Sequence, residues 1–67
     1  MISYAPLWKT LKRQNITQYQ LINRYGISTG TLDALRKGKS VTLNTVQDLC
    51  RILQCPLSDV VEILPDE

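Results

Sequence analysis

Histidine and phenylalanine are absent from this 67-residue chain, and cysteine occurs only twice. Histidine is the side chain that most often exchanges protons near neutral pH. Neither a phosphate-binding glycine loop nor a clustered carboxylate pair takes its place, so we expect no enzyme activity and no cofactor. Cys50 and Cys55 are too few for a zinc site or a disulfide scaffold. We therefore expect no metal, and a reducing, cytoplasmic setting.

Long apolar segments are also missing, since no more than two hydrophobic residues follow one another. This excludes a membrane span and the hydrophobic region of a signal peptide within the sequence. Hydrophobic residues make up 43% and charged residues 21%, as in ordinary folded domains. At this length we expect one domain, residues 1–67, with neither a membrane partner nor a small-molecule ligand.

Charge is distributed unevenly along the chain. Residues 1–40 carry seven cations and one anion, whereas residues 41–67 carry one cation and five anions. The two parts therefore have net charges of +6 and −4, although the whole chain has only +2. This asymmetry favours a polyanionic partner for the first part. Uneven placement of ordinary surface charges remains the alternative.

Helical spacing predicts one helix near each end of the chain. Pro6 suits the first turn of a helix that ends near Asn15. Thr42 can cap another helix, in which apolar residues recur at i, i+3, i+4 and i+7: Val46, Leu49, Cys50 and Leu53. Pro56 breaks that pattern, and the short segment after it fits either a helical turn or a strand. Residues 2–4 alternate in character and could pair with this segment as a strand.

Between these regions, two short helices are predicted on either side of a tight turn. Thr17-Gln18-Tyr19-Gln20 has the capping-box spacing and predicts a helix over about 17–25. Ser28 can cap a second helix over about 28–37, and a glycine follows each helix end. Together, residues 17–37 form a helix-turn-helix candidate. In such a motif the second helix enters the DNA major groove while the first contacts the phosphate backbone.

The order of these motifs resembles the Cro and phage-repressor family of helix-turn-helix domains, also called Xre-like. The similarity covers roughly residues 6–64 and is carried by the stretches PLWKTL (6–11), ITQYQL (16–21), YGISTGTL (25–32), KGK (37–39), LCRILQC (49–55) and SDVV (58–61). It implies an all-α, compact five-helix lambda-repressor-like fold. It also implies a non-enzymatic, DNA-binding transcriptional regulator and, within that class, a repressor.

The resemblance further implies which residues contact double-stranded DNA. One polar residue would grip a phosphate from the start of the first motif helix, the second helix would reach base edges, and the loop after it would bind the backbone. The implied residues are Gln18, Ser28, Thr29, Gly30, Thr31, Asp33, Ala34, Lys37, Lys39 and Ser40. Gly30 and Ala34 depart from the glutamine, asparagine or arginine common in the family, so we expect modest specificity or readout of DNA shape.

A single helix of this length meets few base pairs, so we expect a homodimer on half-sites about one helical turn apart. The expected interface is the C-terminal segment, at Leu57, Val60, Val61, Ile63 and Leu64. The alternative is that these residues pack inside the monomer. A second hypothesis for the whole chain is a protein-interaction module of the same fold, antitoxin-like or an anti-repressor partner, with little DNA affinity.

Overall fold

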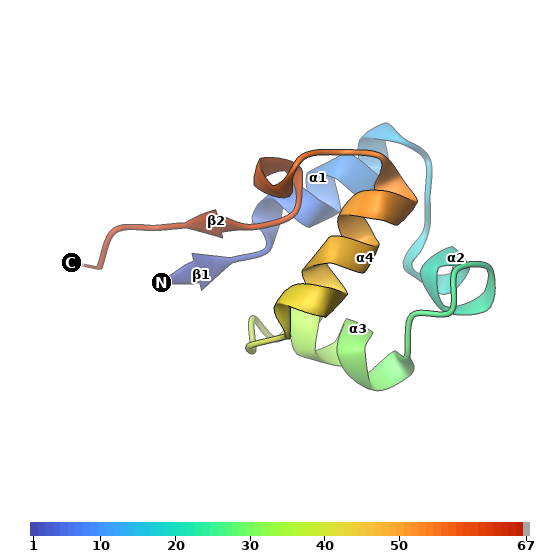
Figure 1. The fold of residues 1–67 in the computed structure, drawn as a ribbon, viewed down its shortest axis with the longest axis horizontal. Coiled ribbons are helices and arrows are strands. Elements are labelled where there is room, and N and C mark those ends of the chain that lie inside the picture. The colour runs from blue at the N-terminus through green and yellow to red at the C-terminus, as the bar shows by residue number, and fades with distance from the viewer. Residues whose placement is uncertain (67) are drawn as a thin grey trace.

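Four α-helices and a two-stranded sheet make up the fold, which a computed structural model describes for residues 1–66 (Figure 1). In chain order the elements are β1 (Ile2–Ser3), α1 (Ala5–Arg13), α2 (Gln18–Asn23), α3 (Thr29–Arg36), α4 (Leu43–Leu53), the 3-10 turn η1 (Leu57–Asp59) and β2 (Glu62–Ile63). The strands pair antiparallel, with Ile2 opposite Ile63 and Ser3 opposite Glu62. Figure 1 shows this ribbon extending away from the helices.

The prediction of a fifth helix is wrong. Residues 57–59 form a single 3-10 turn, after which the chain extends into β2. Pro56 cannot continue α4, and the β-branched residues that follow suit the strand that β1 completes. The strand pairing predicted for the two ends of the chain is therefore confirmed. None of the helices in residues 1–66 is long and apolar enough to cross a membrane.

The first helix ends close to Asn15, as predicted, whereas α4 ends at Leu53, before the proline that was expected to break it. Asn15 and Gln54 have φ angles of 59° and 50°, in the left-handed region that few non-glycine residues adopt. The backbone amide of the next residue then donates a hydrogen bond to a carbonyl of the preceding helix. The Ile16 amide donates to the Leu11 carbonyl, and the Cys55 amide donates to the Cys50 carbonyl. These bonds satisfy carbonyls that the helix end would leave unpaired. The end of α4 is thus set at Gln54, before Pro56 is reached.

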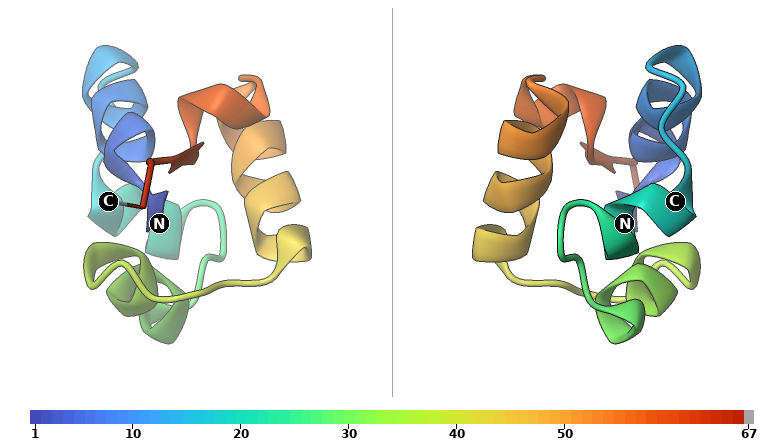
Figure 2. Two further views of the ribbon diagram at one scale, coloured as in Figure 1. Left: turned by 90° about the vertical axis from the view of Figure 1, so that its left-hand side faces the viewer. Right: turned by 90° about the vertical axis from the view of Figure 1, so that its right-hand side faces the viewer.

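The hydrophobic core takes apolar side chains from all four α-helices and from the segments that flank them. Its buried members are Tyr4, Leu7, Leu11, Leu21, Ile27, Leu32, Leu35, Val46, Leu49, Leu53 and Val60. Cys50, predicted on the buried stripe of α4, is only half-buried at the edge of this cluster. Figure 2 shows α1 and α4 on opposite sides of the molecule, and both helices contribute buried side chains to the core between them.

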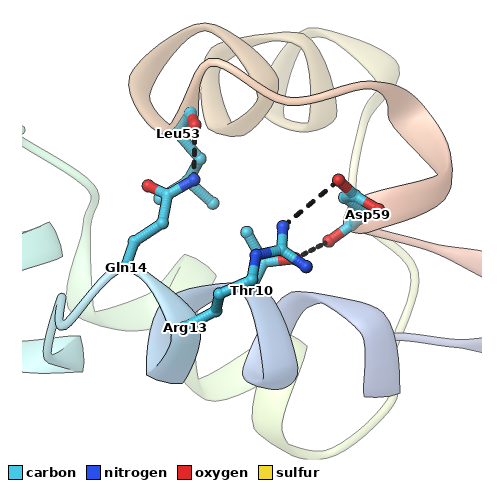
Figure 3. A network of polar contacts seen from close by, with 5 residues as sticks. All are labelled: Thr10, Arg13, Gln14, Leu53 and Asp59. Carbon is cyan, nitrogen blue, oxygen red and sulfur yellow. Dashed lines mark hydrogen bonds and ion pairs between the residues drawn. The ribbon is translucent and has the colours of Figure 1, made fainter.

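Polar contacts fix α1 against the C-terminal part of the chain (Figure 3). The fully buried Thr10 hydroxyl donates to the Asp59 carbonyl at 2.7 Å, and the Arg13 guanidinium lies 3.3 Å from the Asp59 carboxylate. The Gln14 side-chain amide donates to the Leu53 carbonyl at 2.8 Å, at the end of α4. The bonds from Thr10 and Gln14 pair backbone carbonyls that would otherwise be costly to bury. Together, these contacts hold α1 and the residue after it against η1 and the end of α4.

Candidate nucleic-acid interface

The predicted helix-turn-helix is formed by α2, α3 and the turn between them. Thr17 and Gln20 make both hydrogen bonds of the capping box, so the predicted start of α2 is confirmed. Ser28 caps α3, because its hydroxyl oxygen accepts from the Thr31 amide at 3.1 Å. Gly26 has a φ of 77° and makes the left-handed step between the helices. Local hydrogen bonds thus fix both helix starts.

The outer side of α3 carries the residues that the resemblance implies for base contact. Leu32 and Leu35 face the core and are buried. Thr29 and Gly30 are exposed, while Thr31, Asp33 and Ala34 are half-buried. The helix is therefore held from one side only, and its first turn is open to a partner.

Several implied contact residues already have partners within the chain. The Ser28 hydroxyl donates to the Thr31 hydroxyl at 2.8 Å, so these two side chains first serve the helix cap. The Asp33 carboxylate and the Lys37 ammonium lie 3.1 Å apart, one helical turn from each other. Exposed pairs of this kind contribute only about 0.3–0.5 kcal/mol, so a phosphate can displace them.

The loop after α3 has a defined backbone. Gly38 has a φ of 71°, and its amide donates to the Leu35 carbonyl at 3.3 Å. The Lys39 amide donates to the Ala34 carbonyl at 2.9 Å, which completes a Schellman motif. From the far end of the chain, the hydroxyl of the buried Tyr4 donates to the Lys39 carbonyl at 2.8 Å. The Lys39 backbone is thereby anchored, while its side chain and that of Ser40 are exposed.

At the other end of the motif, Gln18 is tied to α3. Its side-chain oxygen accepts a hydrogen bond from Nε of Arg36 at 2.6 Å. The contact joins the first residue of α2 to the last residue of α3 across 18 positions of sequence. Arg36 is not among the residues predicted to contact DNA, and no local spacing signals this bond.

Most of the positive charge in residues 1–40 is unpaired. Arg13 and Lys37 each lie within salt-bridge distance of a carboxylate. Within residues 1–66, no such carboxylate partner occurs for the other five cations of this part: Lys9, Lys12, Arg24, Arg36 and Lys39. Because charges without internal partners remain available to a polyanion, the charge asymmetry of the sequence persists in the folded surface.

The two cysteines do not form a metal centre in the part of the chain that the structure describes. No three histidine, cysteine or acidic side chains gather there in a group that could hold an ion. Partial burial raises the pKa of the Cys55 thiol, and the neighbouring Cys50 and Asp59 raise it further. A thiol with a raised pKa stays protonated at neutral pH and is a poor ligand.

Comparison with known proteins decides the family. The family model of the Cro/C1-type HTH DNA-binding domain matches residues 6–66. The chain belongs to this family. The resemblance inferred from the sequence motifs is thus confirmed, and the Cro/C1-type domain is a DNA-binding module of transcription regulators.

Two relatives of this Cro/C1-type chain agree with that assignment. It is 30% identical over 59 residues to the uncharacterized HTH-type transcriptional regulator YozG of Bacillus subtilis (strain 168), which covers 85% of this chain and 70% of that protein. It also superimposes on the crystal structure of the transcriptional regulator VanUg, form II, with a TM-score of 0.88 and 32% identity. That match covers 97% of this chain and 87% of the VanUg chain. The fold and the regulator class therefore rest on sequence and structure together.

Proposed function

We propose that this Cro/C1-type chain is a transcriptional repressor that binds double-stranded DNA as a homodimer, with α3 in the major groove. The observation that carries this proposal is the open outer side of α3, which lies between two polar regions that we expect to contact the DNA backbone. Gln18 lies at the start of the motif, and the anchored Lys39 loop lies at its end. A bound dimer covers its site and excludes other proteins from it, so repression requires no further domain.

The residues of the proposed interface divide into three roles. Gln18, Lys37, Lys39 and Ser40 contact phosphates. Exposed or half-exposed residues of α3 face the bases, and these are Thr29, Gly30, Thr31, Asp33 and Ala34. Ser28 caps the helix and places its first turn. Since few of these side chains offer a bidentate contact to a base, DNA shape and half-site spacing supply a large part of the specificity.

Replacing Lys39 with glutamine is expected to weaken binding to all DNA sequences alike. Losing one phosphate contact should flatten the slope of log affinity against log salt by about one unit. Fluorescence anisotropy with a labelled duplex at several salt concentrations measures the slope. Arg51→Gln is the matched control, because Arg51 lies on α4 and already pairs with Asp48 at 3.0 Å. An unchanged slope for Lys39→Gln would remove this loop from the interface.

Replacing Gly30 with alanine is expected to separate stability from DNA binding. Gly30 lies in the first turn of α3, and a Cβ atom added there would meet nothing within 4 Å. The fold therefore does not need glycine here, and alanine should stabilise the helix by about 0.5 kcal/mol. On DNA the added methyl group should leave binding unchanged, because the resemblance implies that larger side chains are common at this position in the family. Thermal denaturation and DNA titration of the same sample test both effects, and a large loss of DNA affinity would contradict the proposed placement of α3.

The second candidate function is a protein-interaction module of the same fold. The absence of hydrogen-bonding side chains at Gly30 and Ala34 favours it. The five cations of residues 1–40 that have no carboxylate partner within residues 1–66 favour DNA instead. Retention on random duplex DNA distinguishes the two. Salt-sensitive retention supports the regulator, and passage without retention at low salt supports the interaction module.

The proposed dimer surface is an apolar groove between the β1–β2 ribbon, the start of α4 and η1, with a volume of about 200 Å³. Ile2 and Ile63 are opposite each other on the ribbon, and Tyr4 and Val61 line the same groove. Leu43 and Leu57 complete its rim and are 82% and 56% exposed. The interface predicted from sequence is wrong at Val60, which is fully buried in the monomer. Since no charged residue lines this groove, a second copy can approach it without repulsion.

A further inference from the structure

The hydrogen bond between Arg36 and Gln18 determines how the Gln18 amide is oriented. A guanidinium group has only donors, so only the Gln18 oxygen can accept from Nε of Arg36. The amide nitrogen of Gln18 is then directed to the other side, with two hydrogens to donate. The terminal nitrogens of Arg36 also remain free, because neither of them makes a hydrogen bond or ion pair within residues 1–66.

Lys12 adds a third donor to this place. A hollow of about 270 Å³ between α1 and α2 is lined by Trp8, Lys12, Thr17 and Gln18, among others. A neighbouring hollow of about 320 Å³ between α1, β1 and the end of α3 is lined by Trp8, Arg36 and Gly38, among others. Trp8, which is half-buried, lines both hollows. Lys12 and Gln18 line the first hollow and Arg36 lines the second, and the Arg36–Gln18 hydrogen bond joins the two.

We infer that Lys12, Gln18 and Arg36 form one binding site for a DNA backbone phosphate, with Arg36 holding the Gln18 amide in its donating orientation. This inference rests on the proposed DNA-binding function and extends it by two residues that the family pattern did not indicate. We call these three side chains the phosphate cluster.

The chemistry of the phosphate cluster selects an anion. Its free groups are an ammonium, an amide NH₂ and the two terminal nitrogens of a guanidinium, all of them donors. Among residues 1–66, no carboxylate lines either hollow, and none lies within salt-bridge distance of Lys12 or Arg36. Guanidinium and ammonium groups gain most from a phosphate, which accepts several charge-assisted hydrogen bonds at once.

The position of the cluster fits a backbone rather than an isolated ion. Gln18 is the residue through which the motif is expected to grip a phosphate, and Gly38, in the second hollow, belongs to the loop that carries Lys39. Arg36 therefore lies between the two predicted backbone contacts. We therefore expect a strand of DNA that follows the motif from Gln18 toward the loop to pass this side chain.

The test measures DNA affinity against salt concentration for Arg36→Met and Lys12→Met. Each change should weaken binding roughly tenfold or more near physiological salt and flatten the log–log salt slope by about one unit. Arg51→Met removes the same charge from α4, outside the cluster, and should leave the slope unchanged. Thermal denaturation of each variant shows that it is folded at the temperature of the titration.

A double-mutant cycle tests the positioning role of Arg36. If Arg36 orients the Gln18 amide, Gln18→Ala should cost several-fold less affinity in the Arg36→Met protein than in the original chain. Arg36→Lys keeps the charge but loses the Nε donor, so it should keep the salt slope while losing part of the affinity. This milder variant also serves if Arg36→Met fails to fold.

The outcomes separate this inference from the function on which it rests. Suppose that the unaltered chain binds DNA, and that Arg36→Met has the same slope of log affinity against log salt as the unaltered chain and the Arg51→Met control. The inference of a phosphate cluster is then wrong, while the proposed DNA-binding function stands. Additive losses in the cycle would overturn the positioning role of Arg36. A chain that shows no salt-dependent DNA binding at all would instead overturn the proposed function.

Discussion

Replacing Leu32 with alanine is expected to lower the free energy of unfolding by about 2–5 kcal/mol. The side chain is fully buried, and α3 contributes only Leu32 and Leu35 to the buried core. A chain of this size has a total stability of only about 5 kcal/mol, so most of it would be lost. The melting temperature should fall by roughly 10 °C or more. Chemical denaturation followed by circular dichroism measures the change.

Leu43→Ala provides the matched control for this effect. Leu43 is also a leucine in a helix, at the start of α4, but it is 82% exposed. At protein concentrations where sedimentation finds monomers, its replacement should change the unfolding free energy by less than about 0.5 kcal/mol. Equal losses for the two variants would mean that α3 is not held by Leu32, and the attachment of α3 would need another explanation.

The helix starts could be predicted from sequence because their causes are local. Thr17, Ser28 and Thr42 each accept a hydrogen bond from the amide three residues later, as their spacing indicated. A hydroxyl at the cap needs no distant partner to act. The helix-turn-helix therefore followed from residues 17–37 alone, and its core side followed from the period of the apolar residues.

The end of α4 and the C-terminal segment were harder to predict for a physical reason. Gln54 adopts a left-handed φ angle of 50°, which glutamine rarely does, so the sequence gives little warning that α4 ends there. Asn15 was easier to predict as a helix end, because asparagine tolerates this conformation. The extended conformation of β2 depends on β1, which lies 60 residues earlier in the chain. A short apolar segment that is helical in one context is a strand in another when a partner strand is near.

The same distinction applies to the candidate site. The outward placement of Thr29 and Gly30 follows from helical period, and the Asp33–Lys37 pair follows from spacing of four residues. By contrast, the bonds from Arg36 to Gln18 and from Tyr4 to Lys39 span 18 and 35 positions. Such contacts depend on how helices pack, and local sequence spacing carries no information about them.

Replacing Ile63 with lysine is expected to separate the proposed dimer into monomers. Ile63 is 81% exposed on β2 and lies in the same groove as Leu57 and Leu43. An exposed apolar groove of this kind marks an association surface, and a buried unpaired ammonium is costly enough to prevent its closure. Sedimentation of the free protein, or of the complex on a selected two-half-site duplex, measures the change.

The loss of the dimer should have a large effect on DNA binding. Two linked recognition helices bind with an effective concentration that raises affinity by about 10²–10⁴-fold over one helix. Ile63→Lys should therefore lose roughly 100-fold or more on a site with two half-sites, although the added positive charge favours DNA. On a duplex with one half-site, the variant and the original chain should bind alike.

Glu62→Gln is the control that isolates the apolar contact from the charge. Like Ile63→Lys, it raises the net charge by one unit on β2. Glu62 is next to Ile63 in the strand, so its side chain points to the opposite side of the ribbon. The dimer and its affinity should survive this change, because Glu62 does not line the groove. If Ile63→Lys and Glu62→Gln behave alike, the groove does not join the two copies. A one-to-one complex of the unaltered chain on a non-palindromic site would remove the dimer itself, and the specificity would then have to come from one α3 helix and the shape of its DNA.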